Sequence, residues 1–385
     1  MNWKQMHMYR KIVVASDSFK GSLTSLQVAD SAERGVHEVY SDCEVVKVNV
    51  ADGGEGTMEA LRQTLGGKVV HVDVADPLGR MVNAPYVILD DGVTAVLEMS
   101  AASGLTLLEP GERNPLKTST YGTGQLIADA LSKGCRKFLV GIGGSATNDA
   151  GMGMMRALGC RFLDAEGKEL DGTGSSLINV EDIDVSCLAE GLNESEFIVA
   201  CDVDSPLYGP KGAAFVFSPQ KGADRDMVEA LDKGLEHFAS VVRHVMGRDV
   251  AEIPGAGAAG GLGGGFLAFT NARLERGVEM VLDAIGFDNM IRSADLVITG
   301  EGRVDFQTLT GKTPYGVLKR ARKQNIPVIA IGGSVTLSDE EVLKAGFAGA
   351  YAVTPAGMPL EEAMKADVAS HNVTSAVASI LKKSV

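Results

Sequence analysis

The chain has 385 residues, more than one ordinary hydrophobic core holds, so two domains are expected. Its formal net charge of −14 argues against nucleic acid or an anionic membrane as a partner, because either needs a basic surface. The five cysteines have no C-x-x-C spacing, and no apolar run approaches the length of a membrane span. These features predict a cytoplasmic protein with reduced thiols, preceded by a disordered lead-in at residues 1–9.

The first part of the chain alternates apolar runs with loops and helices. A capping-box pattern at Thr24 predicts a helix that runs to about Val36. A second helix is expected over residues 57–65, because Gly66 and Gly67 directly after it would end it. The strands expected in this β-rich part lie at residues 12–14, 45–50, 69–74 and 84–89.

The middle of the chain has a different character. Apolar residues recur at spacings of three and four from Val228 to Val245, which predicts one long helix that packs against a sheet. Residues 255–265 are too rich in glycine for a helix interior. From Asp295 the alternation of strands and helices returns. The strands expected there lie at residues 296–299, 328–331 and 351–353.

Together these segments predict an α/β protein with two three-layer α/β domains. Both chain ends are expected to form one doubly wound, Rossmann-like domain from residues 10–85 and 290–385. Residues 86–289 are expected to form a second α/β domain that is inserted into the first. The boundaries are placed where the alternation of strands and helices stops and resumes.

Five loops combine glycine or serine with acidic residues, and each follows an apolar run. They lie at residues 17–22, 51–57, 143–149, 202–206 and 300–305. Such loops form the ligand crevices at the carboxyl ends of strands in α/β sheets. Their backbone N–H groups suit phosphate, and their carboxylates suit a hard cation such as Mg²⁺. The combination predicts metal-assisted phosphoryl transfer.

The residues alone leave alternatives open for these loops. Asp17 and Lys20 have two equally good interpretations: an anion-binding loop, or a helix cap beside a solvated lysine. Asp52 belongs either to a ligand-binding loop or to a glycine-rich turn that it caps. The run 141–149 resembles a phosphate loop but lacks the complete G-x-G-x-x-G pattern. Residues 311–313 match only the second half of a P-loop, because phenylalanine stands where its first glycine is required.

Seven motifs carry a resemblance to a known family. They are DSFKGSL at 17–23, ADGGEGT at 51–57, GGSATND at 143–149, CDV at 201–203, PQKGA at 219–223, GAAGGLG at 257–263 and TGEGRVD at 299–305. On these motifs the chain resembles the type-1 glycerate kinase family from about Lys11 to its C-terminus, with departures at Ser16, Ala150 and Asp204-Ser205. The resemblance implies ATP-dependent phosphorylation of D-glycerate between two α/β domains, with 2-phosphoglycerate as the usual bacterial product.

That reaction assigns expected roles to the residues of the loops. Lys20 and Arg303, together with Ser18, are expected to bind the glycerate, and Lys20 is an alternative ligand of the γ-phosphate. Asp202 is expected to act as the general base or to orient the attacking hydroxyl. Lys20 and Asp17 are the other two catalytic candidates.

The implied cofactors are ATP and Mg²⁺. Asp52 and Glu301 are the expected metal ligands. The backbone and side-chain donors expected to bind the phosphates of ATP are Gly53, Gly54, Gly143, Gly144, Ser145, Asn148, Gly260 and Gly261. The expected partners are thus two small molecules, D-glycerate and ATP, without nucleic acid or membrane, and the oligomeric state is left open.

Other interpretations use the same residues. A glycerate 3-kinase would have the same loops and a different product. A catalytically inactive sensor of nucleotide or carboxylate would keep the fold, although retention of all the carboxylates argues against it. A kinase of the GHMP class is suggested only by the run Gly257 to Gly265, which lacks the Gly-Leu-Gly-Ser-Ser-Ala of that class.

Overall fold

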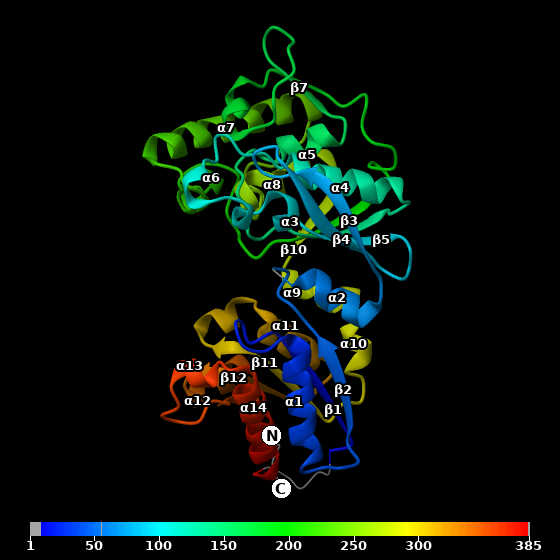
Figure 1. Ribbon diagram of the computed structural model, residues 1–385, viewed down its shortest axis with the longest axis vertical. Helices are drawn as coiled ribbons and strands as arrows, with labels where there is room; N and C mark the ends of the chain where they lie inside the picture. The colour runs from blue at the N-terminus through cyan, green and yellow to red at the C-terminus, as the bar shows by residue number, and fades with distance from the viewer. Residues whose placement is uncertain (1–8, 55, 384–385) are drawn as a thin grey trace. The chain divides into compact units, whose positions relative to one another are not determined.

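The structure is a computed structural model that describes residues 9–54 and 56–383. The chain divides into two compact units (Figure 1). Unit 1 is built from both chain ends, up to Asp52 and from Val281 onward, together with residues 59–64. Unit 2 comprises residues 53–58 and 65–280. No helix in the described part of the chain is long and apolar enough to cross a membrane.

Unit 1 contains a five-stranded sheet in which every strand pair is parallel. Its strands are β1 (Lys11–Ser16), β2 (Glu44–Asn49), β11 (Leu296–Val304), β12 (Val328–Val335) and β13 (Gly349–Ala352). Their order in the sheet is β13-β12-β11-β1-β2. The central strand β1 is buried from Ile12 to Ser16, as expected for a parallel strand that is covered on both faces.

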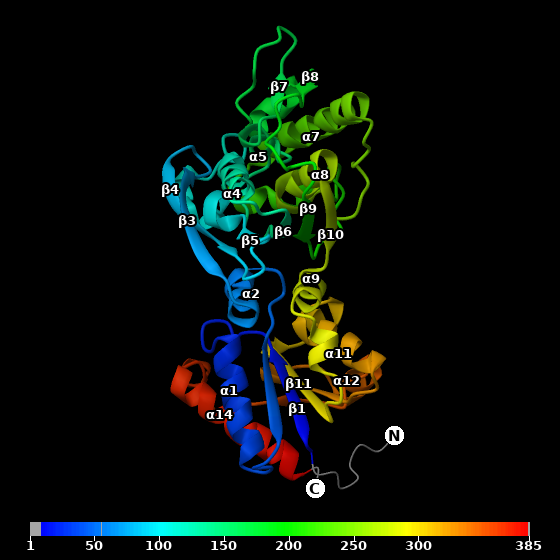
Figure 2. The ribbon, with the colours of Figure 1, turned by 90° about the vertical axis from the view of Figure 1, so that its right-hand side faces the viewer.

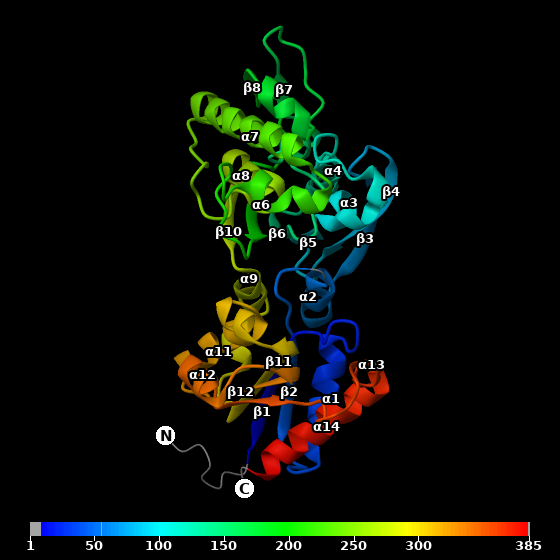
Figure 3. The same cartoon turned by 90° about the vertical axis from the view of Figure 1, so that its left-hand side faces the viewer.

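Helices cover both faces of this sheet, so unit 1 has three layers (Figure 3). One face carries α1 (Ser25–His37), which begins with the expected capping box, and α14 (Ala366–Lys382), which packs against α1. The other face carries α11 (Thr313–Lys323) and α12 (Asp339–Ala345). The shorter helices of this unit are α10 (Phe287–Met290) and α13 (Leu360–Ala363).

The connectivity of the sheet diverges between β1 and β11. From β1 the chain passes through α1 to β2 on one side, whereas β11, β12 and β13 follow one another on the opposite side. In open α/β sheets the crevice at the carboxyl ends of the strands beside such a point is the usual ligand site.

Unit 2 contains a six-stranded mixed sheet. Its strands are β3 (Lys68–Ala75), β4 (Met81–Ile88), β5 (Thr94–Glu98), β6 (Lys137–Gly141), β9 (Glu196–Ala200) and β10 (Asn271–Glu275). Their order is β10-β9-β6-β5-β4-β3, with antiparallel pairing only among β3, β4 and β5. Two short strands, β7 (Arg161–Leu163) and β8 (Asp182–Asp184), form a separate antiparallel pair.

The larger helices of unit 2 gather on one side of its sheet (Figure 2). They are α4 (Tyr121–Ser132), α5 (Met152–Ala157), α7 (Arg225–Met246) and α8 (Ala258–Phe269). In the core that they share with the sheet, the rings of Phe138 and Phe197 stack at a centroid distance of 4.5 Å. Helix α7 confirms the long amphipathic helix that the apolar spacing predicts. The other α-helices in the described part of the chain are α2 (Thr57–Leu65), α3 (Ser100–Ser103), α6 (Ala213–Phe217) and α9 (Gly277–Ala284).

The expected domain boundaries near residues 85 and 290 are misplaced. Strands β3 and β4 belong to unit 2, because β4 pairs with β5 and so extends the sheet of that unit. The chain therefore leaves unit 1 near Asp52 and returns to it near Val281. Nothing in the sequence of a strand states which sheet it joins, so this pairing was not accessible from the residues.

Two further expectations differ from the structure. The glycine-rich segment 255–265 is helical in its second half, and α8 carries a break at Ala259, Gly260 and Gly261, whose φ angles are positive. Of the expected lead-in, residues 1–8 lie outside the described residues. Tyr9 is buried, and its ring lies 5.4 Å from that of Tyr40.

Candidate active site

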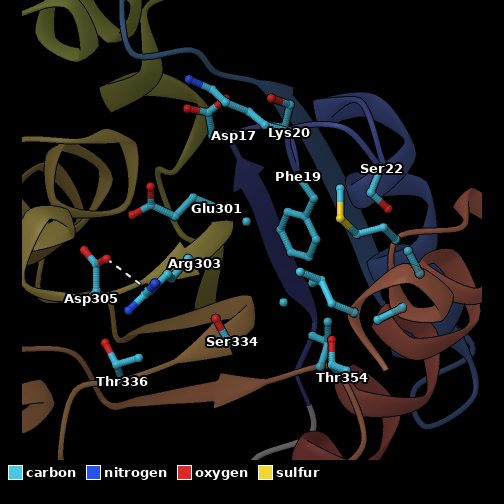
Figure 4. Close-up of a pocket in the computed structure, with 18 of the residues that line it drawn as sticks. Asp17, Phe19, Lys20, Ser22, Glu301, Arg303, Asp305, Ser334, Thr336 and Thr354 are labelled. Atoms are coloured by element: carbon cyan, nitrogen blue, oxygen red, sulfur yellow. Dashed lines mark hydrogen bonds and ion pairs between the residues drawn. The ribbon is translucent and has the colours of Figure 1, made fainter. Parts of the chain in front are cut away.

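A cavity of about 1100 Å³ opens at the carboxyl ends of β1, β11, β12 and β13 in unit 1. It thus lies where the connectivity of the sheet diverges. Figure 4 shows Glu301, Arg303 and Asp305 on one side of the cavity and Phe19 on the other. The residues that the sequence analysis singled out and that line the cavity are Asp17, Ser18, Lys20, Asp52, Glu301 and Arg303.

Asp17 follows β1 directly and is held by both neighbouring segments. Its backbone N–H donates to the carbonyl of Gly300 at 2.8 Å, which ties the loop to β11. Its carboxylate accepts hydrogen bonds from the N–H of Ser18 at 2.6 Å and the hydroxyl of Thr313 at 3.1 Å. Burial, followed by the charge of Asp52, raises the pKa of Asp17 to about 6. A carboxylate with a pKa so close to neutrality can exchange a proton at physiological pH.

Glu301 lies within β11 and is buried. Its carboxylate accepts a hydrogen bond from the hydroxyl of Thr308 at 2.6 Å and forms an ion pair with Lys312 at 3.4 Å. Burial raises the pKa of Glu301, and the hydrogen bond from Thr308 and the charge of Lys312 oppose the rise. Lys312 and Thr313 were missed as site residues, although the incomplete P-loop at residues 311–313 was the signal that could have found them.

The cations of this cavity are more accessible than its acids. Lys20 is exposed, and Arg303 has 65% of its side chain exposed while it pairs with Asp305 at 3.3 Å. Figure 4 shows Lys20 beside Asp17, and Arg303 below Glu301 and paired with Asp305. The cavity thus offers positive charge that a small anion can reach.

A magnesium ion fits two of these acids. The described residues contain no group of three or more acidic, histidine or cysteine side chains arranged to hold a metal. Magnesium, however, is commonly held by one or two carboxylates together with substrate phosphates. The charge of Asp52 raises the pKa of Asp17, so a cation bound to both would offset their repulsion. Glu301 is already engaged by Lys312 and is the less suitable ligand.

The predicted phosphate loop of unit 2 is only partly accessible. Gly143 and Gly144 are exposed after β6, and Ser145 is half-buried. Asn148 is fully buried, and its carboxamide oxygen accepts a hydrogen bond from the hydroxyl of Ser218 at 2.9 Å. Asn148 therefore holds the loop through its carboxamide oxygen, while its amide nitrogen is buried without a hydrogen-bond partner.

Gly260 and Gly261 lie in close backbone packing. Both are buried, and a Cβ on Gly260 would lie 2.0 Å from the carbonyl oxygen of Thr147. Glycine is required at Gly260 because the backbone at Thr147 packs directly on α8. Gly53 is likewise buried against Gly277, whereas Gly54 is half-buried.

Two buried charged side chains at the loop 143–149, Asp149 and Lys221, were not predicted as site residues. Asp149 accepts hydrogen bonds from the N–H and hydroxyl of Thr120 at 2.7 and 2.8 Å. Lys221 is 1% exposed, and its ammonium group donates to the carbonyl of Thr147 at 2.6 Å. Burial lowers the pKa of Lys221 to about 7, and the charge of Asp149 opposes the fall. The motif PQKGA contains this lysine, but only the structure gives its burial.

Asp202 follows β9 in unit 2 and is exposed. Its carboxylate accepts a hydrogen bond from the N–H of Gly277 at 3.1 Å, and Arg276 donates to its backbone carbonyl. Arg276 also binds both carboxylate oxygens of Asp204 at 2.9 Å. The loop is thus fixed at its backbone while the carboxylate of Asp202 stays accessible.

Comparison with known proteins agrees with this arrangement. Residues 12–384 match the model of the glycerate kinase family. A glycerate kinase of Bacillus subtilis (strain 168) is 47% identical over 355 residues, which cover 92% of this chain and 93% of the relative. A glycerate 2-kinase of Escherichia coli (strain K12) is 46% identical over 355 residues, with 92% and 93% covered.

A solved structure is similar throughout. The crystal structure of a protein described as putative glycerate kinase 2 from Salmonella typhimurium LT2 superimposes with a TM-score of 0.89 at 44% identity, and covers 97% of this chain and 98% of its own. A ligand cavity at the divergence of a parallel sheet, carrying both lysine and carboxylates, suits phosphoryl transfer, and with these relatives it identifies a phosphotransferase. The chain belongs to the glycerate kinase family.

Proposed function

We propose that the protein transfers the γ-phosphoryl group of ATP to the 2-hydroxyl of D-glycerate, with Mg²⁺ as the cofactor. The main support is the convergence of Lys20, Arg303 and several carboxylates in one cavity of a chain that belongs to this family. Glycerate has a carboxylate that needs a cation and a hydroxyl that needs an acceptor. The choice of the 2-hydroxyl follows the Escherichia coli relative, which is named glycerate 2-kinase.

Unit 1 supplies charge in this proposal. Lys20, Arg303 and Ser18 bind the carboxylate of glycerate, and Lys20 is also suited to the γ-phosphate as a compact ammonium. Asp52 binds magnesium, with Asp17 as the better-suited second ligand and Glu301 as the third candidate. Bound magnesium would neutralise charge on the phosphates.

Unit 2 supplies the acceptor for the proton and the hydrogen-bond donors to phosphate. Asp202 takes the proton of the attacking hydroxyl or orients it. The accessible donors for phosphate are those of Gly143, Gly144 and Ser145. Gly54 is half-buried and lies close to Gly143, since a Cβ on Gly143 would be 3.9 Å from the Cα of Gly54. Asn148 acts by holding this loop.

A coupled assay of ADP release with D-glycerate, ATP and Mg²⁺ tests the proposal. We expect release that depends on all three, and a fall of kcat by roughly 10² in Asp202→Asn, the lower range for a positioned base. Asp204→Asn is the matched control, because Asp204 is exposed, lies two residues away and is bound by Arg276. Its kcat should stay within a few-fold of the parent.

The same assay separates the alternatives. An inactive sensor would bind ATP or glycerate, measured by calorimetry, without releasing ADP, and this result would contradict the proposal. Equal losses in Asp202→Asn and Asp204→Asn would remove the role of Asp202 and leave only a structural effect of the loop.

A further inference from the structure

The cavity of unit 1 is larger and less polar than glycerate requires. Its volume is about 1100 Å³, slightly above the range of roughly 300–1,000 Å³ that is typical of sites for drug-sized ligands. Glycerate has three carbons, each of which carries oxygen, so it has little apolar surface to bury. Part of the cavity therefore has a purpose that glycerate does not explain.

That part has an apolar wall. Behind Phe19, the segment that follows β13 contributes Val353, Met358, Leu360 and Met364 to the lining. Figure 4 shows Phe19 and Thr354 on the opposite side of the cavity from the charged group of Glu301, Arg303 and Asp305. The cavity thus has a charged part and an apolar part.

The apolar wall is held in place but not filled. The methyl group of Met364 packs on the turn at Gly21, where an added Cβ would lie 2.9 Å from it. The amide of Asn372 on α14 donates to the sulfur of Met358 at 3.5 Å. Leu360 is 74% exposed, so its apolar surface is open to a ligand in the cavity.

We propose that this apolar part binds the adenine base of ATP, so that unit 1 holds the nucleotide. The inference rests on the proposed function, since it assumes that ATP is the phosphoryl donor. A flat aromatic ring gains free energy from apolar side chains on its faces, and Thr354 and Asn372 provide polar atoms for its edge or for the ribose.

This placement is consistent with the charges of the same cavity. A nucleotide whose base lies against Phe19 and Leu360 would extend its triphosphate toward Lys20 and Lys312, which leaves Arg303 for the carboxylate of glycerate. There the γ-phosphate would meet the metal ligands proposed above. Gly260 has the backbone of Thr147 as its closest neighbour, so packing alone explains a glycine at this position.

A pair of leucine variants tests the inference. Leu360→Asp removes apolar surface and adds charge beside the proposed base, so we expect KM for ATP to rise roughly tenfold or more. KM for glycerate should change by less than about twofold, because the substitution leaves the charged part intact. Leu343→Asp is the control: Leu343 is 62% exposed on α12 in the same unit and does not line the cavity.

Photolabelling with 8-azido-ATP and Mg²⁺, followed by peptide mapping, locates the base directly. We expect labelled residues within 353–372 or 17–23, and loss of the label when ATP is added in excess. Labelling within 143–149 or 257–265, or an active enzyme without label in the cavity, would overturn the inference. Labelling in the cavity by a protein that does not phosphorylate glycerate would instead contradict the proposed function and leave the nucleotide site standing.

Discussion

The acid- and glycine-containing loops of the two units look alike in sequence but are covered differently. In unit 1, Asp17 and Lys20 reach a large cavity, and Lys20 is exposed to solvent. In unit 2, Asn148 and Gly260 are buried, and the loop rests on a fully buried lysine, Lys221. The comparison teaches that residues of the same type differ in what they can reach: Asp17 and Lys20 line a cavity, whereas Asn148 and Gly260 take part in close packing and leave only the start of the loop, residues 143–145, accessible.

The first test of this difference removes the ammonium group of Lys20. Lys20→Met should lower kcat/KM for glycerate or ATP by roughly 10², the upper effect expected for a charged hydrogen bond. Lys20→Arg should restore only part of it, because a planar guanidinium does not replace a compact ammonium. Steady-state kinetics measure both variants.

Lys323→Met is the control for that experiment, since Lys323 is exposed on α11 and lies outside the cavity. If Lys20→Met and Lys323→Met had the same kinetics as the parent, Lys20 would be an ordinary surface lysine and the loop would be no more than a helix cap.

A second test compares two glycines of unit 2. Gly260→Ala should lower the free energy of unfolding by about 1–3 kcal/mol, because its φ is +70° and the new Cβ would strike the carbonyl of Thr147. Gly143→Ala should leave stability nearly unchanged, since its Cβ would meet only Gly54, at 3.9 Å. Urea denaturation measures both changes. A stable Gly260→Ala with a raised KM for ATP would show instead that Gly260 binds phosphate.

The sequence was informative where the signal is local. The capping box at Thr24, the apolar face of α7 and the strand at Ile12 each depend on neighbouring residues, and all three are present. The assignment of β3 and β4 to unit 2 depends on hydrogen bonds between distant segments, so the sequence could not supply it.

Burial explains the corresponding limit for the site. Type and spacing selected Asp17, Lys20 and Glu301, which do meet in one cavity. The same criteria selected Gly261 and Asn148, which are buried, and passed over Lys221 and Lys312. Whether a polar residue faces a ligand or the protein interior depends on the segments packed around it, which residue type does not reveal.

The third test concerns the protonation of Asp17, which burial and Asp52 favour. If the ionised carboxylate is required, kcat/KM should fall on the acid side with an apparent pKa near 6, by about tenfold per pH unit below it. A pH–rate profile measures this. Asp17→Asn would lack the limb in its residual activity, and a limb that persists unchanged in the variant would belong to another group.

The same shift has a consequence for stability. The folded pKa of Asp17 is raised to about 6 from 3.8, so the folded state binds more protons than the unfolded state between these values. The contribution of Asp17 to stability is therefore largest below about pH 4 and is lost as the pH rises through 6. Asp17→Asn should be more stable than the parent above pH 6, and this advantage should shrink toward pH 4 in chemical denaturation at each pH.

The most direct test of the proposed reaction is a proton-coupled phosphorus NMR spectrum of the product from D-glycerate, ATP and Mg²⁺. Phosphate on C2 is attached to a carbon with one hydrogen, so its resonance should be a doublet. Phosphate on C3 is attached to a carbon with two hydrogens and gives a triplet. The account predicts the doublet of 2-phosphoglycerate; a triplet would contradict the regiochemistry, and the absence of any new phosphate ester would contradict the function itself.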